Sequence, residues 1–394
     1  IINEIKKEFQ YFYPVDSRHS GRDLVPNHLT FFVLNHVAIF PQSNWPREIV
    51  VNGSVLMNGS KMSKSMGNII PLRKAISDHG ADPIRLAIII SAELLQDADF
   101  NMESVSGIQN KIEMLFVECS KLKAGIPERF EAEDKWIKSK TQNMILQVTL
   151  AVEKMRLREA LHDILFSFES DLSWYMKRAN AKNRTNISGI LHDIHSTRIT
   201  MLSPFAPHIA EEMWQKLGHL GMVSLSKWPE FSQGEVDATA IQSEEYLKST
   251  IEDISKILKV TKIIPQKITV YTANLFKFKV YHSILEKVMT GQTNMGIIMK
   301  ELISNPNTEE VKKIPDFVQK TIKDILSEPT EIRRMKLESK SFDEKSFLVN
   351  ELAEIGEKEF GVEIQVFSES DSDIYDPKEK ARHARPFKPA ILIE

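Results

Sequence analysis

The chain has 394 residues, of which 42% are hydrophobic and 27% are charged. It is too long for one compact domain, so we expect two or three domains. Lysine and arginine total 51 against 54 for aspartate and glutamate, a formal net charge of -3, so a nucleic-acid site would have to be a local patch. The single cysteine excludes an internal disulfide framework and a zinc site built on several thiolates.

No stretch of the sequence has the character of a membrane anchor. The longest apolar runs, such as residues 86–90, fall far short of the ~20 residues that cross a bilayer, and no signal-peptide pattern opens the chain. We therefore expect a cytoplasmic monomer without membrane contact. Because the chain opens with isoleucine and helical spacing begins at once, we also expect it to start inside a larger polypeptide.

Residues 1–103 mix short apolar runs with glycine turns, a pattern typical of α/β structure. Residues 48–52 read as a β-branched strand, and Asn52-Gly53 predicts a hairpin to the next apolar run, residues 54–57. Apolar residues three and four apart predict a helix over residues 29–40, closed by Pro41, with His36 in the core.

Long amphipathic helices are predicted in residues 104–234, which indicates a helical bundle. Apolar stripes mark residues 105–122, 161–179 and 187–202, and Ser203-Pro204 is expected to begin a further helix that ends at Gly218.

Residues 235–394 alternate between helical and strand-like patterns, which fits a small α/β domain. We expect helices over residues 246–263 and 343–360 and strands over residues 267–271 and 362–367.

The most informative segment is residues 58–68, in which Lys61 and Lys64 stand among small hydroxyl residues between two glycines. Lysine ammonium groups stabilise negative charge developing on a leaving pyrophosphate, Ser63 and Ser65 can donate hydrogen bonds, and flanking glycines let such a loop close. The alternative is a solvated turn between a strand and a helix, which is the usual role of so short a cationic loop.

Residues 61–65 are similar to the KMSKS signature of class I aminoacyl-tRNA synthetases, and residues 66–68 extend the match. In that family the loop stabilises the transition state in which an amino-acid carboxylate attacks the α-phosphate of ATP. The resemblance implies that Mg²⁺ accompanies ATP and that the protein itself holds no metal. It implies catalytic roles for Lys61 and Lys64 and ATP binding by Lys61, Met62, Ser63, Lys64 and Ser65.

Residues 13–29 resemble the region before this loop in leucyl-tRNA synthetases of the archaeal and eukaryotic-cytosolic type, and residues 80–85 and 204–212 agree in order. The substrates implied are leucine, ATP and leucine tRNA. The isoleucyl and valyl enzymes share the same skeleton and remain an alternative. The implied fold is mostly α with α/β parts: the second half of a class I Rossmann-type catalytic fold in residues 1–103, a helical tRNA-binding bundle in 104–234, and a C-terminal α/β domain in 235–394.

Three residues before the loop are candidates for substrate binding on this resemblance. Gly21 and Asp23 would lie at a strand end near the adenosine, where a carboxylate accepts ribose hydroxyls. Asp23 is equally suited to cap the following helix. His28 would reach leucine or the adenylate, although a lone histidine on a helix is more often structural.

The family has two signatures, and the first, an HIGH-like tetrapeptide, is absent from this sequence. We therefore expect the chain to be a C-terminal portion that does not aminoacylate by itself, and also lacks an editing domain. A non-catalytic tRNA-binding paralogue that merely keeps the loop is the alternative.

Local basic clusters are candidates for tRNA contact. Residues 154–158 and 177–184 could follow phosphates, although charged helix faces are usually only solvated. Arg382, Arg385 and Lys388 lie in a proline-stiffened run that resembles the part of archaeal-type leucyl enzymes contacting the long variable arm. A frayed tail is the alternative there.

Overall fold

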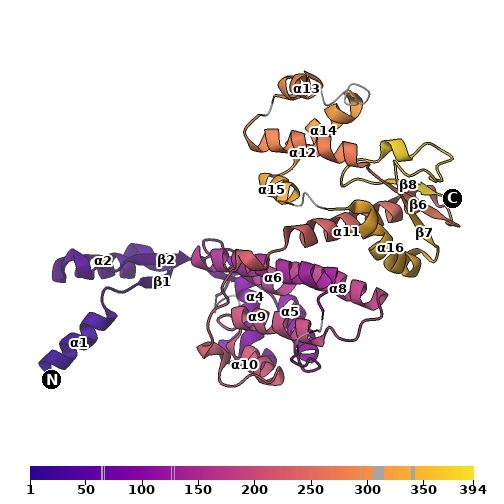
Figure 1. Ribbon diagram of the computed structural model, residues 1–394. Coiled ribbons are helices and arrows are strands. Elements are labelled where there is room, and N and C mark those ends of the chain that lie inside the picture. Colours follow the sequence, from indigo (N-terminus) through magenta and orange to yellow (C-terminus); the bar gives the residue numbers. More distant parts are fainter. Residues whose placement is uncertain are drawn as a thin grey trace. The chain divides into compact units, whose positions relative to one another are not determined.

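The computed structural model describes residues 1–63, 65, 67–125, 127, 129–292, 294–304, 315–338 and 342–394. Within this part of the chain it is mostly helical and contains three small sheets (Figure 1), so the predicted class, mostly α with α/β parts, is confirmed. The chain forms two compact units. Unit 1 comprises Ile1–Ile126, Asn143–Ser170 and Ser188–Phe231; unit 2 comprises Pro127–Gln142, Asp171–Ile187 and Ser232–Glu394.

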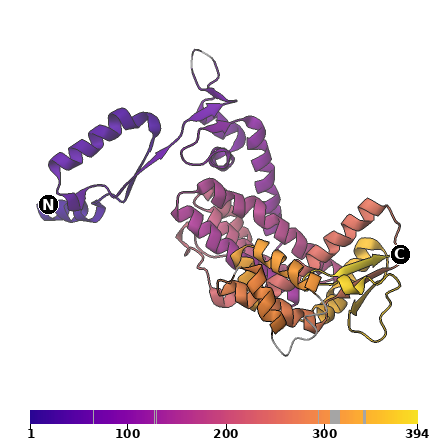
Figure 2. The ribbon, with the colours of Figure 1, turned by 90° about the horizontal axis from the view of Figure 1, so that it is seen from above.

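Unit 1 begins with a parallel two-stranded sheet. After α1 (Ile2–Phe12), strand β1 (Ser17–Gly21) pairs with β2 (Glu48–Asn52) from Ser17 opposite Glu48 to Gly21 opposite Asn52. The crossover between them contains a 3₁₀ turn (Arg22–Leu24), a π turn (Val25–Leu29) and α2 (Thr30–Ile39), which Figures 1 and 2 show beside the strands. The predicted helix is therefore confirmed, and His36 is its buried residue.

The hairpin predicted at Asn52-Gly53 is wrong. Strand β3 (Val55–Met57) pairs instead with β4 (Ser60–Lys61) and, in parallel, with β5 (Ala98–Phe100). The Gly53 N–H donates to the Leu94 carbonyl, and a Cβ on Gly53 would lie only 2.0 Å from the Gln96 carbonyl oxygen, so the chain passes from one sheet to another here. The next Asn-Gly pair forms the hairpin: Asn58 and Gly59 have φ of 49° and 74°, the left-handed backbone that this turn requires.

The remaining helices of the first 231 residues carry the predicted apolar stripes. In α5 the stripe residues Val105, Ile108, Ile112, Leu115 and Cys119 are buried as predicted. The helix predicted over residues 161–179 is instead α7, a π turn (Asp163–Ser167) and α8. Helix α10 begins at Pro207, later than predicted, because proline suits the first helical turn. The helices are α3 (Leu72–His79), α4 (Ala81–Ser91), α5 (Met102–Cys119), α6 (Ala132–Glu153), α7 (Leu157–His162), α8 (Phe168–Ala181), α9 (Ser188–Leu202) and α10 (Pro207–Lys216).

Two segments that carried the family resemblance meet in unit 1. Asp82, in α4, accepts a hydrogen bond from the Ile209 N–H at 2.7 Å and thereby caps α10. Arg85, one turn further along α4, donates to the carbonyls of Phe205 and Pro204 at 2.9 and 3.1 Å. The two segments on which the resemblance rests are therefore hydrogen-bonded to each other.

Unit 2 contains the third sheet, in which β6 (Ile268–Thr272) lies between parallel β7 (Ile364–Ser368) and antiparallel β8 (Ala390–Ile393). Helix α11 (Ala238–Thr261) begins earlier than predicted because Asp237 caps it, accepting from the Ala240 N–H. Helix α16 (Glu344–Phe360) ends at left-handed Gly361, as predicted. Four helices were not predicted: α12 (Leu275–Met289), α13 (Met295–Ser304), α14 (Pro315–Ser327) and α15 (Thr330–Glu338).

Candidate functional site

The β3–β4 hairpin carries the start of the signature loop, residues 58–68. The Gly59 N–H at the turn donates to Asp99 Oδ1 on β5 at 2.7 Å. Lys61 ends β4 opposite Leu56, and its side chain is exposed. The hairpin therefore presents Lys61 to solvent from an anchored stem.

The Asn68 side chain closes the loop. Its Oδ1 accepts from the Ser63 N–H at 2.8 Å, and its Nδ2 donates to the Lys61 carbonyl at 3.1 Å. The hydroxyls of Ser63 and Ser65 lie 2.7 Å apart. Because one carboxamide binds the backbone at two points, the conformation of residues 61–63 depends on Asn68. Lys64, the second predicted catalytic lysine, lies outside the described residues.

Asp97 connects the hairpin to the end of β1. Its Oδ1 accepts from the Ser54 N–H at 2.7 Å, before β3, and its Oδ2 pairs with Arg22 at 2.8 Å. The Ser54 hydrogen bond, with a further contribution from the Arg22 guanidinium, lowers the pKa of the Asp97 carboxyl. Arg22 directly follows Gly21. The Arg22–Asp97 ion pair therefore joins the predicted adenosine-binding residues to the hairpin that carries the start of the signature loop.

Gly21 and Asp23 lie together at the carboxyl end of β1. A Cβ on Gly21 would come within 2.6 Å of Asp23 Oδ1, so this carboxylate occupies the space above the glycine. The alternative role of Asp23 as a helix cap fails, since neither the 3₁₀ turn nor α2 has a side-chain capping hydrogen bond. His28 is exposed in the π turn, with Nε2 3.2 Å from an Arg18 guanidinium nitrogen. Their ligand roles stay predictions.

Sequence reasoning missed Asn68, Asp97 and Asp99 as supporting residues. Asp97 and Asp99 are two apart at the start of a strand, a spacing that directs both side chains to one face of a sheet. That alternation was the available signal. Asn68 had been noted only as part of the extended signature string.

Three predicted phosphate-binding cations of the bundle are held in ion pairs within unit 2, with Arg178 buried and Lys182 and Arg184 partly buried. Arg178 is 0% exposed, with Nε 2.6 Å from a Glu244 carboxylate oxygen. Lys182 and Arg184 both reach Glu133, at 2.9 and 2.7 Å. Their charges are neutralised inside the protein, so the phosphate interpretation fails for them. The other carboxylates of this buried network are Asp134 and Glu351.

The two aromatic residues beside these cations are packed inside the protein. Tyr175 is fully buried, and its hydroxyl donates to Asp134 at 2.7 Å. Trp174 is also buried and donates through Nε1 to Glu244 at 2.7 Å. Neither ring is free to stack on a base.

The basic run near the C-terminus is docked, so the frayed-tail alternative is wrong. Arg385 and Lys388 share Asp324 of α14, at 2.7 and 3.4 Å. Arg382 is exposed and pairs with exposed Glu379 at 2.9 Å. Of the three predicted tRNA contacts, Arg382 has the most exposed side chain and the most exposed partner.

Buried contacts fix the backbone of this run. Lys277 Nζ, on α12, donates to the carbonyls of Arg382 and Ala384, both at 2.8 Å. The left-handed Phe387 (φ 60°) is almost completely buried, and its N–H donates to Glu344 at 2.5 Å. The cationic side chains are therefore presented from a preformed turn.

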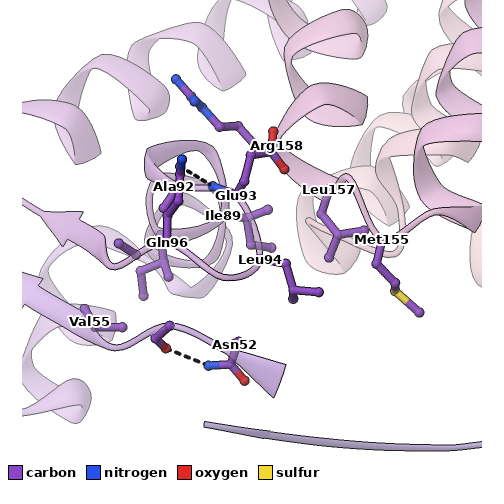
Figure 3. Close-up of a pocket in the computed structure, with 13 residues that line it drawn as sticks. Asn52, Val55, Ile89, Ala92, Glu93, Leu94, Gln96, Met155, Leu157 and Arg158 are labelled. Carbon is purple, nitrogen blue, oxygen red and sulfur yellow. Dashed lines mark hydrogen bonds between the residues drawn. The ribbon is translucent and has the colours of Figure 1, made fainter. Parts of the chain in front are cut away.

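A cavity of about 200 Å³ opens in unit 1, shown in Figure 3. Most of its lining is aliphatic, including Ile89, Leu94 and Leu157. Its amides are already used, since the Asn52 amide donates to the Gly53 carbonyl and Gln96 accepts from the Glu93 N–H. No predicted ATP-binding residue lines it, and its chemistry does not suit a polyphosphate.

Two searches of the described ranges gave no candidates. No cluster of three or more His, Cys, Asp and Glu side chains in this part of the chain is placed to hold a metal ion. Likewise, none of the described helices combines the length and apolar character needed to span a bilayer.

Two family models match parts of the chain. Residues 2–101 match the family of tRNA synthetases class I (I, L, M and V), and residues 134–272 match the anticodon-binding domain of tRNA ligase. In these two segments the chain is similar to class I tRNA synthetases and to the anticodon-binding domain of tRNA ligases.

Within this class the chain is similar over its whole length to leucine–tRNA ligases. It is 38% identical over 403 residues to that of Methanococcoides burtonii, 36% over 401 to that of Methanosarcina barkeri, and 37% over 399 to that of Pyrococcus abyssi. These alignments cover 100% of this chain and 41%, 40% and 39% of the respective relatives. The chain thus spans about two fifths of their length.

A solved LeuRS-tRNA-LeuAMS ternary complex from Agrobacterium radiobacter gives a weaker likeness. It covers 66% of this chain and 31% of its own, at 19% identity and a TM-score of 0.49.

Proposed function

We propose that the chain provides the ATP-handling signature loop and the tRNA-binding parts of a leucine–tRNA ligase. The observation that carries this proposal is that the chain aligns over its whole length with leucine–tRNA ligases and keeps the KMSKS string on an anchored hairpin. Because these relatives are leucine–tRNA ligases, we propose leucine, rather than isoleucine or valine, as the amino acid.

In the proposed reaction, leucine attacks the α-phosphate of ATP, leucyl-adenylate forms and pyrophosphate leaves, with Mg²⁺ accompanying ATP. Lys61 and Lys64 stabilise the charge that develops on the phosphates, and Met62, Ser63 and Ser65 line the same loop. Gly21 allows close approach of the adenosine, and Asp23 accepts the ribose hydroxyls. His28 contacts leucine or the adenylate. The exposure of Lys61 and of Asp23 supports the roles of these two residues.

The leucyl group is then transferred to leucine tRNA, which the bundle (residues 104–234) and the C-terminal α/β domain (residues 235–394) bind. Arg382, Arg385 and Lys388 contact phosphates of the long variable arm. The fixed backbone around Phe387 supports this proposal, because little conformational entropy is lost on binding. Arg385 and Lys388 would exchange Asp324 for phosphate, whereas Arg382 gives up only an exposed partner.

The test uses a hybrid enzyme, the Methanococcoides burtonii leucine–tRNA ligase in which this chain replaces the aligned segment. We expect leucine-dependent pyrophosphate exchange from the hybrid and none from the chain alone, while the chain alone binds leucine tRNA. Exchange driven by isoleucine or valine would favour those enzymes. A hybrid without exchange, beside an active parent enzyme, would favour the non-catalytic alternative.

A further inference from the structure

Asp97 lies at the junction between the two sheets described in unit 1. Strands β1 and β2 form one sheet and β3, β4 and β5 form the other, and Gly53 and Ser54 connect β2 to β3. The Ser54 N–H donates to Asp97 Oδ1 at 2.7 Å, and the Ala98 N–H donates to the Ser54 carbonyl at 2.8 Å. These two hydrogen bonds hold the connection against the residues that lead into β5.

The second oxygen of this carboxylate reaches the end of β1. Asp97 Oδ2 lies 2.8 Å from Arg22 Nη2, and Arg22 directly follows Gly21, the last residue of β1. Gly21 pairs in register with Asn52, the last residue of β2. One carboxylate therefore contacts both the connection that follows β2 and the residue that follows β1.

An ion pair at the opposite end of the same two strands provides a contrast. Asp16 precedes β1 and Arg47 precedes β2, and their side chains pair at 3.1 Å while 87% and 66% exposed. Asp97 is 28% exposed, and the Ser54 amide holds it in place. Ion pairs near the surface contribute little to stability, so the main effect of the Arg22–Asp97 pair is on the relative position of the segments that it joins.

We propose that the Arg22–Asp97 pair is a positioning element that sets the spacing between the adenosine-binding end of β1 and the signature loop, so that one ATP molecule reaches both. This inference rests on the proposed function, in which the adenosine lies at Gly21 and Asp23 and the phosphates lie at Lys61. A ligand that joins two subsites gains affinity from both of them when their spacing matches its own length. The Arg22–Asp97 pair itself touches neither part of ATP and acts through the backbone that it aligns.

The test compares how the hybrid enzyme binds the whole nucleotide and its two fragments. Asp97→Asn keeps an oxygen that accepts from the Ser54 N–H and removes the charge that holds Arg22. By equilibrium dialysis, it should weaken ATP binding at least about tenfold and leave the affinities for adenosine and for inorganic pyrophosphate within about twofold of the parent. Either fragment occupies one subsite, so its binding does not depend on the spacing.

Substitutions of Arg22 establish that the two side chains act together. Arg22→Met should weaken ATP binding as much as Asp97→Asn, and the double variant should be no weaker than either single variant, because both substitutions break one contact. Arg22→Lys retains a cation and should recover part of the lost affinity. Arg47→Met, which breaks the ion pair at the other end of the strands, is the matched control and should leave all three affinities unchanged.

Three outcomes would overturn the proposal. The first is equal affinity for ATP in the parent hybrid and in Asp97→Asn. The second is weaker pyrophosphate binding by Arg22→Met but not by Asp97→Asn, since Arg22 would then be a direct phosphate ligand. The third is an equal loss of affinity for ATP, adenosine and pyrophosphate together with a melting temperature more than about 2 °C below that of the parent, which would indicate a general loss of structure.

The binding measurements do not depend on catalysis. A hybrid that binds ATP and responds to the substitutions as expected, but shows no pyrophosphate exchange, would count against the proposed function alone. A hybrid that exchanges pyrophosphate equally well with and without Asp97→Asn, at limiting and at saturating ATP, would count against the positioning role alone.

Discussion

Asp99 accepts a hydrogen bond from the Gly59 amide at 2.7 Å, which fixes the tip of the β3–β4 hairpin to strand β5. The amide is available because Asn58 and Gly59 both adopt left-handed backbone in the turn. Lys61 follows two residues later, so its position depends on a backbone held by a residue 40 positions along the chain. The exposed side chain of Lys61 is thus combined with a stem that is anchored by a hydrogen bond.

Replacing Lys61 by alanine in the hybrid enzyme should lower the rate of leucine-dependent pyrophosphate exchange by about ten- to thousandfold, the usual effect of removing one electrostatic stabiliser. The affinity for leucine should change less. Lys74→Ala is the matched control, because Lys74 is an exposed lysine on nearby α3. If both variants kept parental exchange rates, Lys61 would not act on the phosphates.

Asn68→Ala should lower the exchange rate by about ten- to a hundredfold, since Lys61 and Ser63 lose their shared backbone anchor. Asn68 is a positioning residue, so hydrogen exchange at the Ser63 amide should accelerate in parallel. Asn68→Asp keeps the acceptor for Ser63 but not the donor to Lys61, and should be intermediate. An unchanged Ser63 amide in the alanine variant would contradict this role.

The Arg178 network predicts a contrast between adjacent residues of α8. Arg178→Ala would leave Glu244 buried without its cation and should reduce the free energy of unfolding by about 3–5 kcal/mol. Lys177→Ala removes a partly exposed pair with Glu359 and should cost at most about 1 kcal/mol. Urea denaturation of both variants measures the difference. Similar losses of unfolding free energy in the two variants would show that burial does not determine how strongly the network stabilises the protein.

The environment of Arg178 also shows which features of the structure the sequence alone does not predict. The stripe of α5 and the ends of α16 are local patterns, and each was predicted correctly. Two Asn-Gly pairs looked equivalent, and what decided between them was the crowding of Gly53 by Gln96, a contact between distant residues. Likewise, nothing local in the chain distinguishes Arg178 from a solvated arginine, because its partner Glu244 lies 66 positions away.

Stability in acid should depend on His195. This side chain is buried in unit 1, and its Nδ1 lies 3.4 Å from Nη1 of the Arg198 guanidinium. Burial, and then the Arg198 charge, lowers the pKa of His195 to about 3 from its usual 6.5. As the pH falls, His195 therefore binds a proton in the unfolded chain before it does so in the folded chain. The stabilisation present above pH 6.5 is lost as the pH falls from 6.5 towards 3.

His195→Gln should flatten the fall in unfolding free energy over that interval, by up to about 1.4 kcal/mol for each unit of pKa shift removed. Denaturation midpoints between pH 7 and pH 4 measure the slope. His208→Gln, at an exposed histidine of the same unit, is the control and should leave it unchanged. Parallel pH profiles for His195→Gln and the parent chain would exclude His195 as the cause.

Arg382 offers the sharpest test of tRNA contact in unit 2. Its side chain is exposed and has an exposed partner, whereas its carbonyl is held by Lys277, so Arg382→Ala removes charge without disturbing the docked backbone. If Arg382 meets a phosphate of the variable arm, the affinity of the chain for leucine tRNA should fall and the slope of log affinity against log salt should decrease by about 1. Removing residues after 376 is a poorer test, because it deletes β8 and exposes an edge of β6.

Two comparisons decide whether that contact is specific. Lys279→Ala removes an exposed cation from α12 and should alter neither the affinity nor the salt slope. A tRNA with a short variable arm should bind the parent chain and Arg382→Ala equally, because it cannot supply the phosphate. An equal loss for both tRNAs, with circular dichroism unchanged, would leave Arg382 as a nonspecific phosphate contact. No loss for either tRNA would remove it from the interface.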